Sequence, residues 1–384
     1  MISRYTQLCP IVFGCGALSS LGSVLQEYGI QKPIIVTDQG IVKAGILARV
    51  EKLLKEINIS CETYTDVEMD APDYCCTAAA EKGLAFHADG VIGLGGGSCI
   101  DASKAISVLC ANPDQNIQEL IAGVPFKRDP IPLVAIATTS GTGSESTIFA
   151  VVSSSFDGRK RSLFTHAAIG IIDPELTLGL SAGVTAYTGL DAMAHAVEAY
   201  TSIRPNPQSD LLSLDAIRRI SKFLPIAVND IHNLEARENL ALASNFAGIS
   251  FNSSATHIGH AIAHAIGANL HIPHGIACAW DLPEVLYLMA KYLPERVKDI
   301  AAAMGVTLTE QLSNEALGTL LREHMHGFLR SVGIPTCDSL GITEEMLAGC
   351  GEYAVTEKLR GLCGAPVTDD EVRQALVNCC RNYH

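Results

Sequence analysis

The sequence is poor in positive charge and in long apolar runs. Its 27 lysine and arginine residues stand against 41 acidic ones, which gives a formal charge of −14. Such a balance opposes binding to nucleic acid or to an anionic membrane surface. No apolar stretch approaches the roughly 20 residues that a membrane-spanning helix needs. We therefore expect neither a nucleic acid nor a membrane as a partner.

The cysteines do not have the pattern of a disulfide framework. There are thirteen, an odd number, and none has the Cys-x-x-Cys spacing of a zinc ribbon or a thioredoxin-type site. The first residues also lack the charged and apolar regions of a signal peptide. We expect a cytoplasmic protein with reduced thiols, most of them packed as small apolar side chains.

The length and the hydrophobic pattern predict two domains. The chain has 384 residues, of which 48% are hydrophobic and 18% charged, enough for a large buried core. The first half alternates between short β-branched runs and amphipathic stretches, which favours a mostly parallel sheet with helices on both faces. The predicted strands are 33–36, 61–67, 90–94 and 131–137, and the predicted helices are 41–57, 74–87 and 98–110.

From about Thr185 onward nearly every segment has helical periodicity. The pattern changes near residues 178–184, where glycine and serine interrupt it. We therefore expect an α/β domain over residues 1–180 and an all-helical domain over residues 181–384.

Two segments of the helical half carry residues suited to binding a metal ion. Asp191 and His195 stand four residues apart, which places both on one face of a helix, and His260 and His264 repeat that spacing. Five of the chain's twelve histidines gather in the segment that ends in the Pro-His-Gly turn at His274. A carboxylate with neutral imidazoles suits zinc or iron(II) and can leave a coordination position open for substrate. The alternative is that these histidines are structural residues of the core.

The α/β half carries two loops suited to a dinucleotide. Three glycines at Gly95–Gly97 follow a predicted strand and open a helix, so that backbone amides and a helix N-terminus can meet a pyrophosphate. A second loop, Thr138–Glu145, is rich in hydroxyl groups. Asp38, at the end of the first strand, can accept hydrogen bonds from a ribose diol and would repel the 2′-phosphate of NADP. For each of these features a plain turn is the alternative.

Taken in order along the chain, these motifs resemble those of the iron-containing (group III) alcohol dehydrogenases. The resemblance rests on Gly-Gly-Gly-Ser-x-x-Asp, Thr-Thr-Ser-Gly-Thr-Gly-Ser-Glu, Asp-Pro-Glu-Leu-Thr, Thr-Gly-x-Asp-Ala-x-x-His-Ala-x-Glu-Ala-Tyr, and His-Ala-x-Ala-His ending in Pro-His-Gly. It runs from about Cys9 to the last helix. It implies a Rossmann-like dinucleotide-binding domain and an all-helical domain, an architecture shared with dehydroquinate synthase, with metal and nicotinamide in a cleft between the domains.

The resemblance also implies a role for individual residues. The implied metal ligands are Asp191, His195, His260 and His274, with His264 beside the nicotinamide as a proton relay. The implied cofactor contacts are Gly95, Gly96, Gly97, Ser98 and Asp101 for the pyrophosphate, Asp38 for the adenosine ribose, Thr138, Thr139 and Thr142 for the nicotinamide side, and Lys160, or alternatively Arg161, as a basic contact. The implied substrate pocket is lined by Phe149, Phe251 and Cys363, while His257 and His271 are expected to be structural or solvent-facing.

The expected activity is the NAD-dependent interconversion of a small primary alcohol and its aldehyde, with aldehyde reduction by NADH as the favoured direction. The expected cofactors are NAD(H) and one divalent metal ion, with Fe²⁺ ahead of Zn²⁺. Arg360, near the predicted pocket, leaves open an anionic substrate such as sulfoacetaldehyde. The partners we expect are a small alcohol or aldehyde and further copies of the chain in a homodimer or larger homo-oligomer. The alternatives are a cyclase similar to dehydroquinate synthase and a protein with a purely structural metal.

Overall fold

The structure is a computed structural model that describes residues 5–308 and 311–383. The chain folds as two compact units. The α/β unit comprises Gln7–Thr139 and Gly143–Gly179, and the helical unit comprises the described residues from Leu180 onward together with Tyr5, Thr6 and Ser140–Thr142.

A parallel sheet of six strands forms the centre of the α/β unit, in the order β1-β8-β5-β4-β2-β3. The bounds of these strands are Ile11–Phe13 for β1, Ile169–Ile172 for β8, Leu133–Ala137 for β5, Gly90–Gly95 for β4, Pro33–Val36 for β2 and Glu62–Tyr64 for β3. β2, β4, β5 and β8 are buried along their whole length, as expected for parallel strands covered on both faces. The carboxyl ends of β4 and β5 lie side by side, with Gly95 paired to Ala137.

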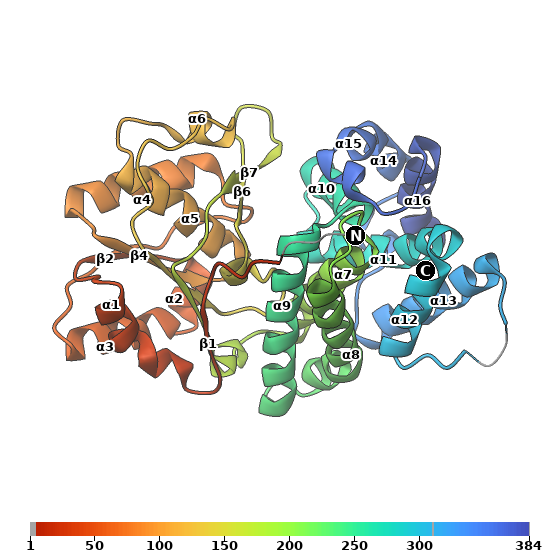
Figure 1. The fold of residues 1–384 in the computed structure, drawn as a ribbon, viewed down its shortest axis with the longest axis horizontal. Helices are drawn as coiled ribbons and strands as arrows, with labels where there is room; N and C mark the ends of the chain where they lie inside the picture. The colour runs from red at the N-terminus through yellow and green to blue at the C-terminus, as the bar shows by residue number, and fades with distance from the viewer. Residues whose placement is uncertain (1–4, 309–310, 384) are drawn as a thin grey trace. The chain divides into compact units, whose positions relative to one another are not determined.

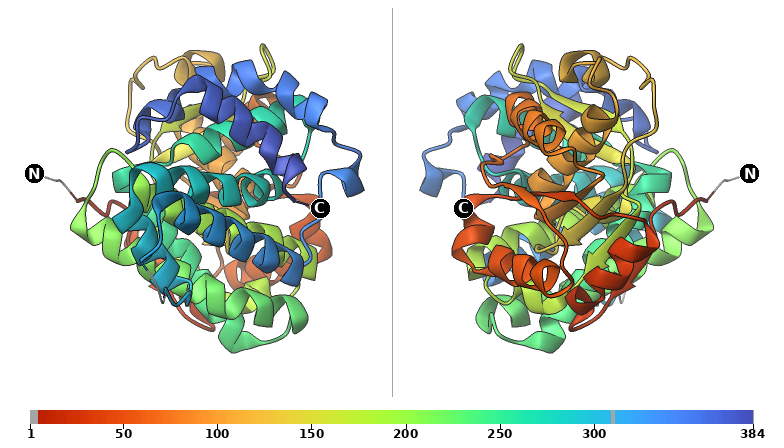
Figure 2. Two further views of the ribbon diagram at one scale, coloured as in Figure 1. Left: turned by 90° about the vertical axis from the view of Figure 1, so that its right-hand side faces the viewer. Right: turned by 90° about the vertical axis from the view of Figure 1, so that its left-hand side faces the viewer.

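Helices cover both faces of this sheet. Their bounds are Leu21–Glu27 for α1, Gln39–Lys43 for α2, Ile46–Glu56 for α3, Asp73–Phe86 for α4, Gly97–Ala111 for α5 and Ile117–Ile121 for α6. The red helices α1 and α3 lie on one side of the strands, and the orange helices α4 and α5 lie on the other (Figures 1 and 2). The apolar side chains of α1 and α3 pack with those of β2, β4 and β5 in one core.

The elements differ from the sequence prediction at several places. The strands β1 and β8 and the helices α1 and α6 were not predicted, and β5 begins at Leu133 rather than at Ile131. The helix predicted over 41–57 is two helices, because Gly45 has a φ of 73°, which ends one helix and begins the next. The strand predicted over 61–67 is shorter. An antiparallel hairpin of β6 (Phe149–Ser153) and β7 (Lys160–Phe164) was not predicted.

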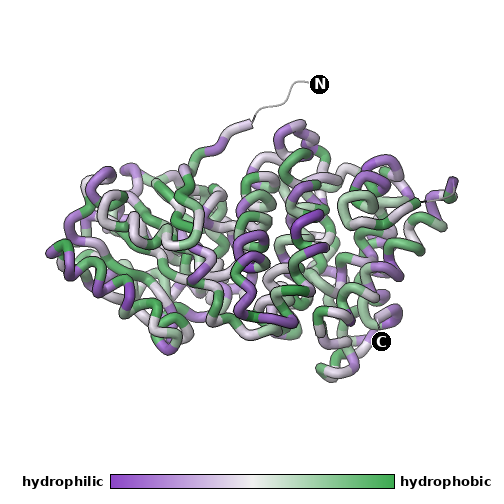
Figure 3. Tube along the Cα trace, turned by 90° about the horizontal axis from the view of Figure 1, so that it is seen from below, coloured by the Kyte–Doolittle hydropathy of each residue, from purple (hydrophilic) through white to green (hydrophobic). Residues whose placement is uncertain are grey.

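The helical unit consists of longer helices around a single core. Their bounds are Ala182–Thr201 for α7, Pro207–Asn229 for α8, Leu234–Ser254 for α9, Ile258–Leu270 for α10, His274–Tyr292 for α11, Pro294–Ala303 for α12, Asn314–Ser331 for α13, Glu344–Gly349 for α14, Gly351–Thr356 for α15 and Asp369–Arg381 for α16. Hydrophobic and hydrophilic segments follow one another along these helices (Figure 3). In an amphipathic helix such a pattern places the apolar side chains on one face. α7, α10 and α11 are largely buried, and many of their core residues are alanine.

The start of α7 is held by a buried arginine. The guanidinium of Arg237 on α9 donates hydrogen bonds to the carbonyl oxygens of Ile231 and Leu180 and to the hydroxyl of Thr185. These bonds satisfy a cation that is almost fully buried. The helix that carries the first predicted metal ligands is therefore fixed at its beginning.

The predicted fold class, a mostly parallel α/β domain followed by an all-helical one, is confirmed. Among the described residues, no helix is both long and apolar enough to span a membrane.

Candidate metal centre and dinucleotide site

The four predicted metal ligands converge inside the helical unit. The Nε2 atoms of His195, His260 and His274 lie 3.8, 3.8 and 3.6 Å from the same oxygen, Oδ1 of Asp191. Asp191, His195 and His260 are buried, and His274 is partly exposed. Ligands at about 2.0–2.2 Å from one ion are separated by distances of this order.

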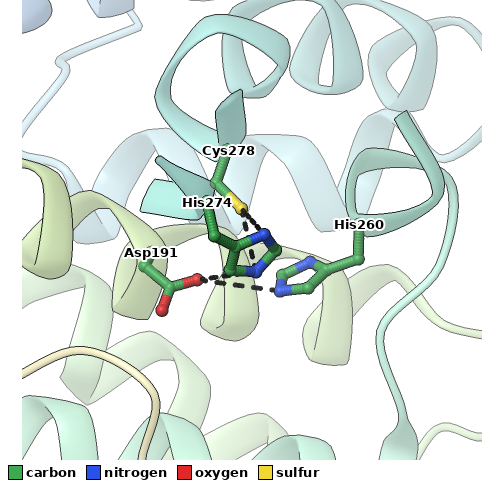
Figure 4. A group of neighbouring side chains, drawn as sticks. All are labelled: Asp191, His260, His274 and Cys278. Atoms are coloured by element: carbon green, nitrogen blue, oxygen red, sulfur yellow. Dashed lines mark hydrogen bonds and ion pairs between the residues drawn. The ribbon is translucent and has the colours of Figure 1, made fainter. Parts of the chain in front are cut away.

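Three helices supply these side chains. Asp191 and His195 lie one turn apart on α7, His260 is in the first turn of α10, and His274 is the first residue of α11. Figure 4 shows Asp191, His260 and His274 pointing toward a common point. The site is thus assembled from residues that are far apart in the chain: His274 follows Asp191 by 83 positions.

Two glycines allow these helices to approach closely. A Cβ atom on Gly275 would lie 2.3 Å from the carbonyl oxygen of Tyr187, so that only glycine lets the first turn of α11 pack against α7. A Cβ atom on Gly259 would lie 2.6 Å from Oε1 of Glu198. Each glycine is adjacent to a predicted ligand, His274 or His260, and each therefore sets that ligand's position.

Glu198 orients His260 from the side opposite to Asp191. Its Oε1 lies 2.6 Å from Nδ1 of His260, and its carboxylate also accepts hydrogen bonds from the backbone N–H groups of His257 and His260. Burial alone would raise the pKa of Glu198, but His260 and His257 lower it to about 2. A carboxylate bonded to Nδ1 leaves Nε2 of the ring as the atom that binds a metal ion.

The residues around this carboxylate are buried as well. Burial raises the pKa of Asp281 well above its ordinary value, and the charges of Glu198 and Asp191 add to the rise. His257 is fully buried, and its Nε2 lies 2.8 Å from the hydroxyl oxygen of Thr201. His271 is exposed at the end of α10. His257 and His271 thus have the structural and solvent-facing positions that we expected.

The electrostatics at the centre fit a bound cation. Oδ1 of Asp191 is buried and has no hydrogen-bond partner among the residues that the structure describes. Burial lowers the pKa of His195 to about 4, so its imidazole is neutral at pH 7. A buried carboxylate oxygen facing neutral imidazoles is costly unless a cation is present. The donor set of one carboxylate and three imidazoles therefore fits a divalent metal ion.

Three further side chains lie beside this group. The ring of Phe251 on α9 stacks on His195 with 4.4 Å between ring centroids. The ring of His264, one turn after His260 on α10, lies 5.5 Å from that of His274. The thiol sulfur of Cys278, one turn after His274 on α11, lies 3.6 Å from the Nε2 atom of His274.

The predicted cofactor residues, except Thr142, belong to the α/β unit. Gly95 ends β4 with a φ of 151°, and a Cβ atom there would lie 2.6 Å from the sulfur of Cys99, so glycine is required. α5 begins directly afterwards, and within the described chain its N-cap residue Gly96 makes no side-chain hydrogen bond to the first turn. Backbone N–H groups at this helix start are therefore suited to an anion.

Asp38 lies at the carboxyl end of β2, next to this loop. Its Oδ1 accepts a hydrogen bond from the backbone N–H of Ile41 and caps α2, and its Oδ2 accepts one from the thiol of Cys99. The capping role is the alternative that the sequence left open. Each carboxylate oxygen retains a second lone pair for another donor.

The hydroxyl-rich loop divides between the units. Thr138 is buried at the end of β5, and Thr139 lies 3.2 Å from where a Cβ atom on Gly96 would stand, so both belong beside the glycine loop. Ser140–Thr142 belongs to the helical unit, where Gly141 packs against Thr188 of α7.

Asp101 and Ser98 are engaged with protein groups. The carboxylate of Asp101 accepts hydrogen bonds from the hydroxyl of Ser144 and the N–H of Val151, which fasten β6 to α5. Its pKa is raised by burial. The hydroxyl oxygen of Ser98 accepts a hydrogen bond from the N–H of Asp70.

The two basic candidates on β7 differ in their surroundings. Nζ of Lys160 lies 2.8 Å from Oδ1 of Asp70, the residue that also contacts Ser98, and the lysine side chain is only 9% exposed. Arg161, the next residue, pairs with Asp157 within the hairpin and is more exposed. Neighbouring residues of a strand point to opposite faces. Lys160 therefore points toward Asp70 and Ser98, next to the glycine loop, and Arg161 points away from them.

The predicted pocket residues Phe149 and Cys363 lie in different units. Phe149 is in the α/β unit, where its ring packs edge-on against Phe164. Cys363 is in the helical unit, where burial raises the pKa of its thiol to about 11 and the sulfur lies 4.0 Å from that of Met289.

The sequence prediction gave no role to three residues that the structure places beside the predicted site residues, namely Glu198, Cys278 and Lys104. Glu198 stands seven residues after Asp191, a spacing that returns to the same helix face, and Cys278 stands four after His274, so both could have been found from helical periodicity. Lys104 had no such signal. Its buried ammonium group donates hydrogen bonds to Ser144, Thr147 and the carbonyl oxygen of Phe149, and burial lowers its pKa to about 8.

Two family models match the chain. The model of the iron-containing alcohol dehydrogenases matches residues 10–174, and the model of the C-terminal part of the same family matches residues 185–379.

Relatives and solved structures agree with these matches. Long-chain-alcohol dehydrogenase 1 of Geobacillus thermodenitrificans is 34% identical over 94% of this chain and 92% of its own length. The structure of a 1,3-propanediol oxidoreductase superposes with a TM-score of 0.92 at 30% identity, covering 99% of this chain and all of the other. The structure of sulfoacetaldehyde reductase from Bifidobacterium kashiwanohense in complex with NAD⁺ has a TM-score of 0.88 at 27% identity and covers 99% of each chain.

The close approach at Gly275 predicts that Gly275→Ala weakens metal binding. The new methyl group must displace α11 from Tyr187, which costs about 1–3 kcal/mol of folding free energy, and moves His274 so that metal affinity falls by about tenfold or more. Thermal unfolding and metal titration measure the two effects. Gly267→Ala is the matched control, since its methyl group would meet only the Ile272 carbonyl oxygen at 3.6 Å. Equal metal affinity of both variants would contradict this role for Gly275.

The contacts of Glu198 predict that Glu198→Gln lowers metal affinity by about 10–100-fold. The amide cannot hold the Nδ1 proton of His260 as the carboxylate does, so Nε2 is no longer presented in one orientation. The control is Asp281→Asn, which changes a buried carboxyl group close to Glu198 and leaves the Glu198–His260 contact in place. We expect the control to bind metal normally. If the two variants lose affinity equally, burial rather than the Glu198–His260 bond is responsible.

Proposed function

The chain belongs to the iron-containing alcohol dehydrogenase family, and within that family we propose that it reduces a small aldehyde to its primary alcohol with NADH, reversibly, at one divalent metal ion. The family resemblance of the sequence is thereby confirmed, and the protein is an oxidoreductase. The observation that carries the proposal is the convergence of the three histidine Nε2 atoms on Oδ1 of Asp191. Membership in an oxidoreductase family favours this activity over the cyclase alternative.

We propose Asp191, His195, His260 and His274 as the residues that hold the metal ion. Fe²⁺ is the first choice because of the family, and Zn²⁺ is the alternative because a set of three nitrogens and one oxygen binds both. When bound, the ion supplies Lewis-acid chemistry, polarising the carbonyl group of the substrate. Phe251, stacked on His195, shields one side of the site from water.

We propose the glycine loop and the carboxyl ends of β2, β4 and β5 as the NAD(H) site. The support is local: the glycine-only conformation of Gly95, the start of α5 without a side-chain cap in the described chain, and the position of Asp38 beside them. In this proposal Lys160 rather than Arg161 is the basic contact, since Lys160 is adjacent to Asp70 and Ser98. A relative of known structure binds NAD⁺.

The substrate we propose is a short, uncharged aldehyde. Arg360 suggested an anionic substrate, but its guanidinium pairs with Asp369 and donates to the carbonyl oxygen of Val367. Its charge is therefore already compensated, which favours chains of ethanol to butanol size over sulfoacetaldehyde. Phe149, Phe251 and Cys363 stay predictions as pocket residues, and the homo-oligomer and the cytoplasmic location stay predictions as well.

Aldehyde reduction by metal-loaded protein tests the proposed function. The metal-stripped protein is reloaded with Fe²⁺ without oxygen, or with Zn²⁺, and NADH consumption is followed with aldehydes of two to four carbons and with sulfoacetaldehyde. We expect turnover of the short aldehydes only after metal loading. His274→Ala should lose turnover and weaken metal retention but still bind NADH. Full activity in the metal-stripped protein or in His274→Ala would refute the proposal.

The charge of Asp38 predicts a preference for NADH over NADPH, because a carboxylate repels the 2′-phosphate. Asp38→Asn keeps a side chain able to cap α2 and removes the charge, so it should narrow the preference. Asp38→Gly should narrow it too but also lose the cap. The ratio of kcat/KM for the two cofactors is the measurement. Equal or better use of NADPH by the unmodified protein would rule out this role.

The position of His264 predicts a variant that separates catalysis from metal binding. If His264 relays the alcohol proton toward solvent, His264→Ala should retain the metal and bind NADH while turnover falls by about 10²–10⁴-fold. Added imidazole should restore part of the activity. His232→Ala, at an exposed position, is the control and should be fully active. Loss of metal from His264→Ala would instead make His264 a ligand and place His260 in doubt.

A further inference from the structure

The connection between α9 and α10 contains a strained residue. Ala255, which follows the last residue of α9, has a φ of 72° and a ψ of 162°. Glycine adopts this combination readily, whereas a residue with a Cβ atom rarely does. All four residues of the turn, 254–257, are buried. Such a conformation persists only where neighbouring contacts hold it.

Ser202 holds the backbone on the N-terminal side of Ala255. It directly follows the last residue of α7, and its buried hydroxyl group donates a hydrogen bond of 2.6 Å to the carbonyl oxygen of Ser254. The same hydroxyl oxygen accepts a hydrogen bond from the N–H of Arg204. The peptide group that joins Ser254 to Ala255 therefore has a fixed orientation.

His257 holds the backbone on the other side. Its N–H donates to the carboxylate of Glu198, and its Nε2 lies 2.8 Å from the hydroxyl oxygen of Thr201. Because that hydroxyl donates its own proton to a backbone carbonyl oxygen of α7, Nε2 carries the ring proton, and Nδ1 accepts the hydrogen bond from the N–H of Ile258. Ile258 is the first residue of α10, so the helix start is fixed two residues before His260.

We propose that Ser202 is a positioning residue for the metal centre, because it keeps Ala255 in the strained conformation and so sets where α10 begins. The inference rests on the metal centre of the proposed function. Asp191 lies on α7, and Ser202 follows the end of the same helix. One helix thus carries the carboxylate and also the contact that places the His260 imidazole 3.8 Å from it. Without that contact Ala255 can return to a negative φ, which redirects the chain just before α10.

The strain at Ala255 is measured on metal-free, full-length protein. Glycine accepts the positive φ, so Ala255→Gly should raise the temperature of thermal unfolding by about 2–4 °C. Ala348→Gly, within α14, is the matched control and should lower that temperature, because glycine destabilises a helix. A fall in both variants overturns the proposal, since Ala255 would then carry no strain for Ser202 to oppose.

The positioning role is measured with metal. Ser202→Ala removes the hydrogen bond to Ser254, so its affinity for Zn²⁺ should fall by about tenfold or more. The visible absorption bands of bound Co²⁺ depend on the geometry of the ligands, and they should change as well. Ser209→Ala is the matched control, because this buried hydroxyl also donates to a carbonyl oxygen of α9, that of Ser250, away from the turn. We expect the control to bind both metals normally.

A double variant separates positioning from a general loss of packing. In the double variant Ser202→Ala and Ala255→Gly, the glycine keeps the conformation of the turn without the hydroxyl contact. Most of the Zn²⁺ affinity and the Co²⁺ spectrum of the unmodified protein should therefore return. An equal loss of affinity with and without the glycine contradicts the role of Ser202 and leaves the metal centre intact.

The remaining outcomes separate the two proposals. Normal metal binding by Ser202→Ala also refutes its positioning role but not the metal centre. Failure of the unmodified protein to bind either Zn²⁺ or Co²⁺ overturns the metal centre and this inference together. The unfolding of metal-free Ala255→Gly needs no change at Ser202, so it tests the strain even if Ser202→Ala does not fold.

Discussion

A buried carboxylate facing three imidazoles is the constraint on which the helical unit depends. Asp191 is almost fully buried, and its Oδ1 has no hydrogen-bond partner in the described part of the chain. Such a charge destabilises a folded protein unless a cation accompanies it. α7, α10 and α11 must therefore meet at one point, with the nitrogens of His195, His260 and His274 around the same oxygen. The packing of α7, α10 and α11 brings these atoms together.

Glycines and buried acidic residues around the proposed metal ligands fix the positions of these ligands. Gly275 and Gly259 leave room where a Cβ atom would collide with Tyr187 or Glu198. Glu198 holds His260 by its Nδ1 atom and is itself held by two backbone N–H groups. Asp281 lies close by, and burial, together with the charges of Glu198 and Asp191, raises the pKa of its carboxyl group. The buried carboxylate of Glu198 thus fixes the orientation of the His260 ring.

The α/β unit depends on a different feature, which is the exposure of backbone N–H groups at the carboxyl ends of its parallel strands. Gly95 gives the turn after β4 a conformation that a side chain would obstruct, and α5 then begins without a side-chain cap in the described chain. Asp101 and Lys104, both on α5, hold the segment from Ser144 to Val151 by hydrogen bonds. The loops at these strand ends are therefore fixed by buried polar contacts rather than by the glycines alone.

The sequence by itself determined the two-domain organisation, four of the six strands of the sheet and the pairs of proposed site residues that share one helix turn. These follow from local rules, since the periods of strands and helices are visible in the order of the residues. The same rules explain the errors: Gly45 divides a predicted helix because its φ is positive. The β6–β7 hairpin was missed although its first strand is rich in apolar and β-branched residues. Only the tertiary structure decided that His260 and His274 meet Asp191 and that Glu198 supports His260. Those contacts join residues of different helices, and helix packing, not local spacing, sets the distances between them.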